Sequence, residues 1–458
     1  MKRFRVAAAA FAIAAALSGC SMMPSYERPA APVPGSWPAP AAAVGTPAAD
    51  LPWQQFFGDQ RLRQLIGIAL RGNRDLRVAV LNIEQARAQY DIRRADRLPT
   101  VGITASGSRA PNGDGNKTTY SAGLGFSSWE IDFFGRVASL SEAALAQYLA
   151  TEEGRKAAQI SLVASVANTW LALVADEELL ELTRQTLATR EESQRLVRLR
   201  FENGVTSELD LRQAQSLAES ARVALAQLAR QRAIDLDSLA LLLGQPVPAE
   251  LVGETNMASL ALPDVPAGTP SEVLARRPDV RQAEQQLVAA NANIGAARAA
   301  FFPRISLTAG LGTASSELSG LFKGGGWGFT AAPQLLQPIF DAGRNRAGLA
   351  SATVSRDIAV AQYERAIQSA FREVADALAG RATFGEQLRA QGQVAEAEAV
   401  RYRLSELRYQ NGVASSLDLL DAQRSLFAAR QALVQTRLQQ LQNQVLLYRA
   451  LGGGWTAP

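Results

Sequence analysis

The feature that most constrains this chain is an internal repeat. The segment LRFENGVTSELDLRQAQ begins at Leu199, and the related segment LRYQNGVASSLDLLDAQ begins 208 residues later, at Leu407. Repeats of about 20 to 50 residues build solenoids and propellers. A period this long instead indicates that each copy forms a complete architectural unit. The identical pairs include Arg200/Arg408, Asn203/Asn411, Gly204/Gly412, Val205/Val413, Leu209/Leu417, Asp210/Asp418 and Gln215/Gln423.

The composition argues against an enzyme and against a nucleic-acid-binding protein. The chain has no histidine, which removes the usual general base and the commonest metal ligand. Its formal net charge is +4, and basic residues are interspersed with acidic ones, unlike the basic patches that bind nucleic acid. We therefore expect no catalytic residues, no metal and no cofactor. At 458 residues the chain can bury two or more cores.

The N-terminus reads as a secretory signal. A short basic segment precedes an apolar stretch at residues 6–17 that is too short to span a bilayer comfortably. The stretch ends Leu-Ser-Gly-Cys at residues 17–20, which resembles the bacterial lipobox, where cleavage leaves a lipid-bearing cysteine. We predict a signal peptide over residues 1–19, a covalent lipid on Cys20 and, because Ser21 follows, the outer membrane. The alternative is an ordinary signal with an unmodified cysteine. No second cysteine exists for a disulfide.

Residues 20–60 are predicted to form the lipid anchor and an extended tether. Eight prolines lie between residues 24 and 52 in an alanine-rich context. Proline fixes φ and removes a backbone donor, so this stretch cannot be a continuous helix. Helical spacing of apolar residues begins at Trp53 and breaks at Gly72-Asn73, and a second helix is expected over residues 74–97.

The hydrophobic period changes to two after Pro99. Apolar residues alternate with polar ones over Thr100–Ser108, a turn-rich loop follows, and the alternation resumes up to Trp129. This pattern predicts a β-hairpin over about residues 99–131, and the second copy has a matching one over about 303–337. Strands of about 10 residues suit a transmembrane β-barrel. The alternative is a small soluble sheet packed on helices.

Two very long helices are predicted over about residues 135–202 and 343–410. Each would reach roughly 100 Å at 1.5 Å per residue if unbroken. The helices that return after the repeated segments are shorter and leave part of each long helix uncovered. Two further helices have the right length to fill these gaps, so that two shorter helices stacked end to end match one long helix. The returning helices are expected at about 207–243 and 415–451, and the gap-filling ones at 74–97 and about 279–302.

The repeated segments mark sharp turns between these helices. Asn203-Gly204 and Asn411-Gly412 are signals for left-handed C-caps, and a Ser-x-x-Asp capping box restarts a helix after each. The chain is therefore expected to form two αα-hairpins with tips at residues 203–207 and 411–415.

One chain offers four strands, which cannot close a barrel. Open sheet edges are not tolerated in lipid, so several chains must share one barrel if the strands cross a membrane. Two chains would give about eight strands and a barrel filled by its own side chains, whereas three would give about 12 and room for a conduit. The residues alone favour the trimer only weakly.

A series of motifs follows the lipobox in a fixed order along the chain. Together they resemble the outer-membrane factor family, the TolC-like exit ducts of tripartite efflux pumps, and within it the lipoprotein branch. The resemblance covers essentially the whole mature chain. The motifs are Trp53…Phe56-Phe57…Asp59…Leu62, Trp129-Glu130-Ile131-Asp132…Phe134-Gly135-Arg136, Arg277-Pro278-Asp279-Val280, Phe302-Pro303, Pro338-Ile339-Phe340-Asp341…Gly343-Arg344 and Leu447-Tyr448…Ala450-Leu451-Gly452-Gly453-Gly454-Trp455.

This resemblance implies a mainly α fold with a β-barrel. The family is a homotrimer with a 12-stranded transmembrane barrel in outer-membrane lipid and a long antiparallel α-barrel in the periplasm. Its partners are a periplasmic adaptor, or membrane fusion protein, and an inner-membrane pump of the RND type. It exports small molecules or drugs. We divide the mature chain into a first repeat at 61–243, an equatorial linker at 244–275, a second repeat at 276–451 and a tail at 452–458.

The resemblance also implies a periplasmic gate at the second tip. Asp418 and Asp421 are spaced i, i+3 and so share one helix face. Three chains would place six carboxylates around one constriction and attract cations. Both match the family's aspartate ring, and Leu417 and Arg424 match further positions implicated in closure. The alternative is that acidic residues in a first helical turn only favour the helix dipole.

The two copies differ at the gate positions. The first copy keeps Asp210 but has Gln213 where the second copy has Asp421. We therefore expect the second copy to be the gate and the first to brace it. Ala414 stands where some family members have a latching arginine, so a latch here needs other partners.

The resemblance further implies that the tip turns dock the adaptor's own hairpin tips; the alternative is that they only cap helices. These residues are Asn203, Gly204, Val205, Thr206, Asn411, Gly412, Val413, Ala414 and Ser415.

Three functions compete at this stage. The first is a passive efflux duct driven by a partner. The second is a duct for secreted protein or for metal ions. Export of metal ions has no direct support, because the chain has no histidine and only four methionines. The third is a lipid-anchored coiled-coil scaffold that forms no pore. A passive duct takes its cargo from the pump, so the sequence does not identify the substrate.

Overall fold

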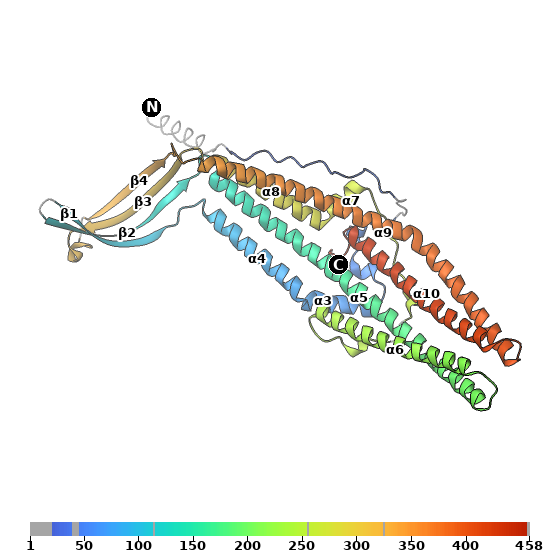
Figure 1. Cartoon of the computed structure of the whole chain (residues 1–458). Helices are drawn as coiled ribbons and strands as arrows, with labels where there is room; N and C mark the ends of the chain where they lie inside the picture. Colours follow the sequence, from blue (N-terminus) through green and yellow to red (C-terminus); the bar gives the residue numbers. More distant parts are fainter. Residues whose placement is uncertain (1–20, 39–44, 113–114, 254–255, 324–325, 456–458) are drawn as a thin grey trace. The chain divides into compact units, whose positions relative to one another are not determined.

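The computed structural model describes residues 21–38, 45–112, 115–253, 256–323 and 326–455 (Figure 1). Cys20, the predicted lipidation site, lies outside these residues. The chain separates into two compact units, each drawing on both repeats. The strand unit comprises Met1–Ala31, Leu81–Glu153 and Arg281–Ala366, and the core unit comprises Pro32–Val80, Gly154–Val280 and Ile367–Pro458.

The strand unit contains one antiparallel sheet of four strands in the order β1-β2-β3-β4. The predicted hairpins therefore pair with each other through β2 and β3. The predicted strand length of about 10 residues is right for β4, which has 10, but too short for β2, which has 17. The register of β2 against β3 shifts between Phe126 and Trp129, and Ser128 has a φ of 54°. The strands are β1 (Gly102–Asn112), β2 (Gly115–Ile131), β3 (Arg304–Ser315) and β4 (Trp327–Leu336).

One row of large apolar side chains crosses all four strands. Ile103 pairs with Leu124, Leu124 with Leu311, and Leu311 with Phe329. Ile103, Leu124, Leu311 and Phe329 are 83%, 55%, 52% and 73% exposed, respectively. Directly opposed residues share one face of a sheet, so an apolar face is open to the surroundings. The alternative of a soluble sheet covered by helices would bury such a row.

The long helices end where the repeat predicts. α5 (Arg136–Glu202) and α9 (Arg344–Gln410) each have 67 residues. α6 (Glu208–Leu243) and α10 (Ser416–Ala450) return from the tips. The remaining helices are α2 (Trp53–Phe56), α3 (Gln60–Gly72), α4 (Arg74–Ala95), α7 (Pro270–Arg276) and α8 (Pro278–Ala299), with short 3₁₀ turns η1 (Ala48–Asp50), η2 (Ala249–Leu251), η3 (Met257–Ser259) and η4 (Leu318–Gly320).

Both long helices begin with the same capping device. Asp132 Oδ2 accepts a hydrogen bond from the backbone N–H of Ala138 at 2.7 Å. Gly135, just before the first residue of α5, has a φ of 70°. Asp341 Oδ2 accepts from the N–H of Asn345 at 2.8 Å, and Gly343 has a φ of 88°. A carboxylate at a helix N-terminus satisfies orphan N–H donors and complements the dipole. The aspartate and glycine of each family motif thus start a long helix.

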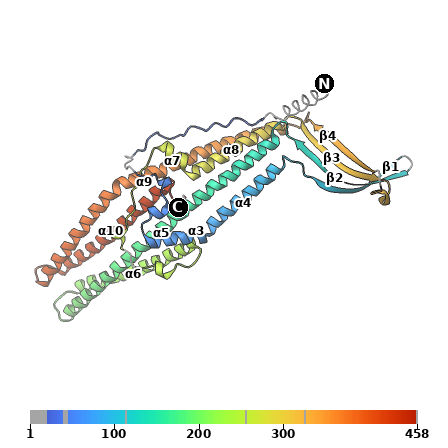
Figure 2. The same cartoon turned by 180° about the vertical axis from the view of Figure 1, so that it is seen from behind.

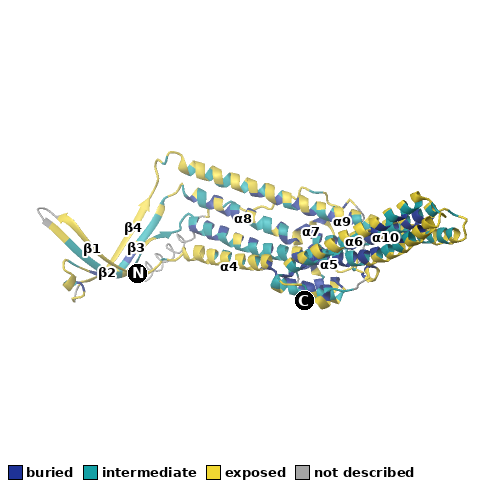
Figure 3. Ribbon diagram, turned by 60° about the horizontal axis from the view of Figure 1, so that its bottom comes forward, coloured by how far each residue is buried: buried dark blue, intermediate teal, exposed yellow. Residues whose placement is uncertain are grey.

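The core unit is held by an aromatic cluster. The rings of Phe56 and Tyr448 stack with centroids 3.9 Å apart, and the Tyr448 hydroxyl donates to the Leu51 carbonyl at 2.6 Å. Among the described residues, α5 is the helix long and apolar enough to cross a bilayer by composition. Its apolar stretch packs into this core, where Figure 3 shows buried residues in dark blue. The buried residues of this stretch include Leu162, Val163, Val166, Trp170, Leu171 and Val174.

The residues described before η1 are extended, whereas η1 and α2 also fall within the predicted tether at 20–60, and the extended residues are packed. Within the core unit, Trp37 is 8% exposed and stacks on Phe371 at 4.9 Å. Within the strand unit, Arg28 forms two hydrogen bonds with Glu284 on α8, of 2.6 and 2.9 Å. A Cβ on Gly295 would lie 2.8 Å from the Met23 Cα, so the glycine allows this close approach.

The shorter helices meet end to end in the core unit, which confirms the predicted stacking. Asn73 Nδ2 donates to the Leu242 carbonyl at 3.0 Å, and Asn73 Oδ1 accepts from the Leu76 N–H at 2.8 Å. One asparagine therefore closes the end of α6 and the start of α4.

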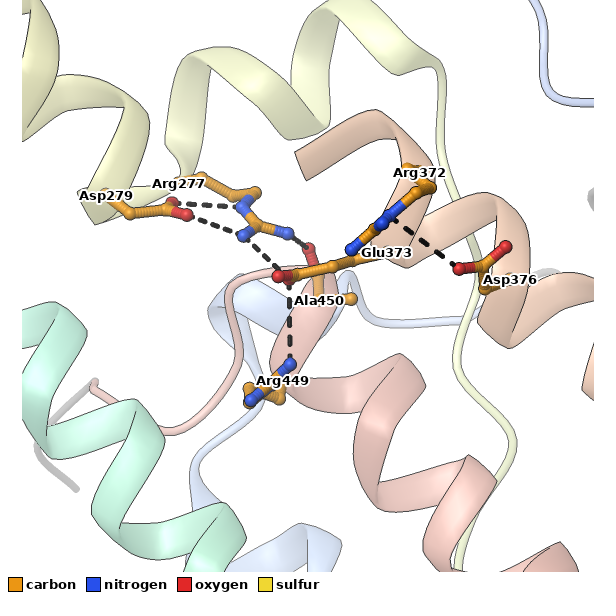
Figure 4. Close-up of polar contacts among 7 residues, drawn as sticks. All are labelled: Arg277, Asp279, Arg372, Glu373, Asp376, Arg449 and Ala450. Atoms are coloured by element: carbon orange, nitrogen blue, oxygen red, sulfur yellow. Dashed lines mark hydrogen bonds and ion pairs between the residues drawn. The ribbon is translucent and has the colours of Figure 1, made fainter. Parts of the chain in front are cut away.

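Arg277 has the same role in the second copy. Its Nη1 donates to the Ala450 carbonyl at 2.8 Å, at the end of α10. Its Nη2 pairs with Asp279 at 2.6 Å, in the first turn of α8, and with Glu373 of α9 at 3.0 Å (Figure 4). The Arg277 side chain is only 7% exposed. A buried charge is costly unless it is paired, so the ion pairs of this cluster fix three helix segments at one point.

Candidate gate at the helical tips

Both tips are built by the same turn. Gly204 has a φ of 71°, and the Val205 N–H donates to the Arg200 carbonyl at 2.8 Å. In the second copy Gly412 has a φ of 73°, and the Val413 N–H donates to the Arg408 carbonyl at 2.9 Å. Glycine adopts positive φ without steric cost, and these bonds satisfy the last carbonyls of the long helices. Figure 2 shows both turns at the far ends of their hairpins.

The predicted capping boxes are both present. Ser207 accepts a hydrogen bond from the Asp210 N–H, and the Asp210 side chain accepts from the Ser207 N–H. Ser415 and Asp418 form the same pair, in which the Asp418 Oδ2 accepts from the Ser415 hydroxyl at 2.8 Å. The hydrogen bonds from Ser415 lower the pKa of Asp418. Asp418 therefore caps its own helix, the alternative that the sequence left open.

Asp210 also joins the two hairpins. Its Oδ1 accepts a hydrogen bond from the Ser416 hydroxyl at 2.5 Å, while its Oδ2 accepts from the Thr206 hydroxyl at 2.8 Å. Hydrogen bonds from Ser416, Ser207 and Thr206 lower the pKa of Asp210 to about 2. An ionised carboxylate with this many donors is a strong acceptor. The bracing position of the first copy thus contacts the start of α10 directly.

Asp421 lies between two arginines. Arg401 of α9 donates to the Asp421 Oδ2 at 2.9 Å, and Arg424 pairs with the Oδ1. The predicted pair with Arg424 is therefore present. Arg401 also donates to Ser425 at 3.0 Å. The Asp421 side chain is 41% exposed, so its charge is shared between α9 and α10 rather than fully solvated.

A second link between the hairpins comes from two residues that the sequence did not assign to the gate. Arg200 Nη1 donates to the Tyr409 hydroxyl at 2.5 Å, and its guanidinium lies 5.4 Å from the centre of the Tyr409 ring. Tyr409 stands where the first copy has Phe201, so only the second copy has the hydroxyl. This departure within the repeat was the available signal.

The turns carry exposed apolar side chains in matching positions. Val205 and Val413 are 64% and 66% exposed, and Leu209 and Leu417 are 67% and 57% exposed. Val205 and Val413 are among the predicted docking residues, of which Thr206 and Ala414 are partly buried and the others are exposed.

The comparisons with known proteins agree over nearly the whole chain. The model of the family described as outer membrane efflux protein matches residues 65–245 and 269–453. This chain belongs to the outer membrane efflux protein family. It is 50% identical over 452 residues to a probable efflux pump outer membrane protein, TtgC of Pseudomonas putida, covering 96% of this chain and 93% of that one. It is 46% identical over 465 residues to outer membrane protein OprJ of Pseudomonas aeruginosa, covering 99% and 97%.

A solved channel has the same fold as this efflux protein. The outer membrane channel MtrE of Neisseria gonorrhoeae, solved in its open state, matches with a TM-score of 0.89 and 42% identity, over 95% of this chain and 99% of that one. The resemblance read from the motifs is thus confirmed. The chain is a non-enzymatic component of an efflux pump in the outer membrane. Within the described residues, no cluster of three or more His, Cys, Asp or Glu is placed to hold a metal.

Proposed function

We propose that three copies of this chain form the passive exit duct of a tripartite efflux pump. The sheet carries the proposal, because it combines two free edges with a row of exposed apolar side chains. Free edges do not persist in lipid, so further copies must close the sheet. Three copies supply about 12 strands, enough to leave a conduit.

The duct would work with a periplasmic adaptor and an inner-membrane pump of the RND type that supplies the energy. Relatives are named for efflux of antibiotics, toluene and solvents. We propose that this chain also exports small, mostly apolar molecules. A lipid on Cys20 would hold the N-terminus at the outer membrane. The packed tether supports this role, because it fixes residues 23–28 along α8.

The tips would form the periplasmic gate. Leu417 and Asp421 would line the constriction, and Asp418 would add charge while capping α10. Arg424 and Arg401 would hold Asp421 in place, and Asp210 would tie the first hairpin to the second. The exposed turns at residues 203–206 and 411–415 would receive the adaptor.

Planar-bilayer conductance of the purified full-length protein tests both parts. We expect a small current from the wild type and a larger one from the double variant Asp418→Ala/Asp421→Ala. The variant Asp418→Asn/Asp421→Asn keeps an acceptor for the cap and removes only charge, so a rise there assigns the effect to electrostatics. The matched control is Asp237→Ala, because Asp237 is an exposed carboxylate of α6 remote from the tip. Absence of conductance in every form would refute the duct, whereas equal currents in all forms would refute only the gate.

A further inference from the structure

A cleft of about 210 Å³ in the core unit contains a buried arginine without a carboxylate partner. Residues of α5, α9 and α10 line it, among them Thr186, Arg190, Tyr402, Gln423, Phe427 and Arg430. No aspartate or glutamate is part of this lining. A single buried water needs roughly 10–15 Å³, so the cleft has room for a small polyatomic ligand.

Arg190 is only 4% exposed, and one edge of its guanidinium is unused. Its Nη1 donates to the Leu217 carbonyl at 3.0 Å, and its cationic carbon lies 5.0 Å from the centre of the Phe427 ring. Its Nε is buried and has no hydrogen-bond partner. Its Nη2 forms no hydrogen bond with any of the described residues. The Nε and Nη2 donors are parallel and match the two oxygens of a carboxylate, phosphate or sulfate group.

A lone buried cation is costly, which sets Arg190 apart from the other deeply buried arginine. Arg277 is paired with Asp279 and Glu373, whereas Arg190 has only a carbonyl and a ring. Burial lowers the pKa of Arg190, with no compensating anion beside it. Removing a charge from water without a counter-ion carries a large desolvation penalty, and an anion in the cleft would recover part of it.

A second cation lies on the same cleft. Arg430 is exposed and forms no hydrogen bond or ion pair with any described residue. The lining therefore has two positive charges and no negative one. Phe427 and Leu426 form apolar walls around them, and electrostatic attraction is stronger beside low-dielectric walls than in water.

We propose that this cleft binds a small oxyanion through the guanidinium of Arg190, with Arg430 at its rim. The ligand class is inorganic phosphate, sulfate or a small carboxylate. Arg190 belongs to the first hairpin and Arg430 to the second, so the bound anion would hold α5 and α10 together. This site is separate from the residues of the gate.

Equilibrium dialysis of radiolabelled inorganic phosphate against the purified full-length protein tests the proposal. We expect saturable binding of about one phosphate per chain, with sulfate competing and chloride at matched ionic strength competing poorly, because only an oxyanion fills a bidentate edge. Arg190→Gln should weaken binding at least about 10-fold, and Arg190→Lys should weaken it less because the charge is kept. Arg195→Gln, on the same helix and paired with Glu192, should bind like the wild type.

Arg430→Gln protects the test against misfolding, because this exposed position can change without disturbing the core. We expect it to weaken phosphate binding about threefold in a protein with unchanged circular dichroism. Lack of saturable binding by the folded wild type would overturn the proposal. So would equal phosphate affinity in the wild type and in folded Arg190→Gln, or displacement by chloride as effective as by sulfate.

Discussion

The hydrogen bond between Ser416 and Asp210 gives the sharpest prediction about the proposed gate. It spans 2.5 Å between residues 206 positions apart and joins the two hairpins of one chain. Replacing Ser416 with alanine removes the donor and leaves the Ser415 cap in place. If the bond exists only in the closed state, the variant Ser416→Ala should therefore open more often.

The size of this effect follows from the environment of the bond. A hydrogen bond to a charged group contributes about 1.5–3 kcal/mol net, and partial exposure of Asp210 reduces this to about 1 kcal/mol. That is about a fivefold change in the open-to-closed ratio for each chain. If three chains open together, the three bonds would give a change on the order of 100-fold.

Single-channel recording of the open probability at neutral pH measures this change. Ser220→Ala is the matched control, because Ser220 is an exposed serine of α6 that bonds only to the Ser216 carbonyl of its own helix. A double-mutant cycle with Asp210→Asn should return a coupling of about 1 kcal/mol. An unchanged open probability in Ser416→Ala would refute the reasoning, since the bond would then contribute equally to both states.

The same bond predicts an acid response. The pKa of Asp210 is lowered from 3.8 to about 2 in the folded protein. A lowered carboxyl pKa stabilises the folded contact above the unfolded value, and this stabilisation is lost as pH falls through the folded value. The wild-type bond between Ser416 and Asp210 should therefore hold above about pH 4 and weaken as pH falls from about 4 to 2, raising the open probability, whereas Ser416→Ala lacks the bond and should lack this part of the acid response.

Two further predictions concern the core unit. Arg277→Met should lower the free energy of unfolding by about 3–5 kcal/mol, because it leaves Asp279 and Glu373 without their partner. The control is Arg372→Met, which should cost under about 1 kcal/mol because the Arg372 side chain is 76% exposed. Equal melting temperatures of the two variants in calorimetry would contradict this. Burial and the carboxylate of Asp235 raise the pKa of Asp176 to about 7, so the native state holds a proton that the unfolded state releases, and stability should fall as pH rises from about 4 to 7. Asp176→Asn should flatten that slope and add about 1–2 kcal/mol at pH 8 after allowance for solvent screening. Thermal melts that keep the wild-type slope in Asp176→Asn would show that another group titrates.

Local signals explain why so much of the fold was predictable. The ends of α5 and α9 agree with the sequence because Asn-Gly turns and Ser-x-x-Asp boxes act through backbone groups a few residues away. The pair of Asp421 with Arg424 was predictable for the same reason, since residues three apart on a helix are neighbours. The length of β2 was not, because the pairing of β2 with β3 extends it.

The sequence by itself determined the repeat, its two helical hairpins and its two β-hairpins. The tertiary structure decided which side chains meet between the helices. Ser416 is the partner of Asp210, Arg401 is the partner of Asp421, and Arg277 closes the end of α10. The physical reason is distance along the chain: caps and turns depend on neighbours within one helical turn, whereas these contacts join separate helices and exist only once the helices have packed.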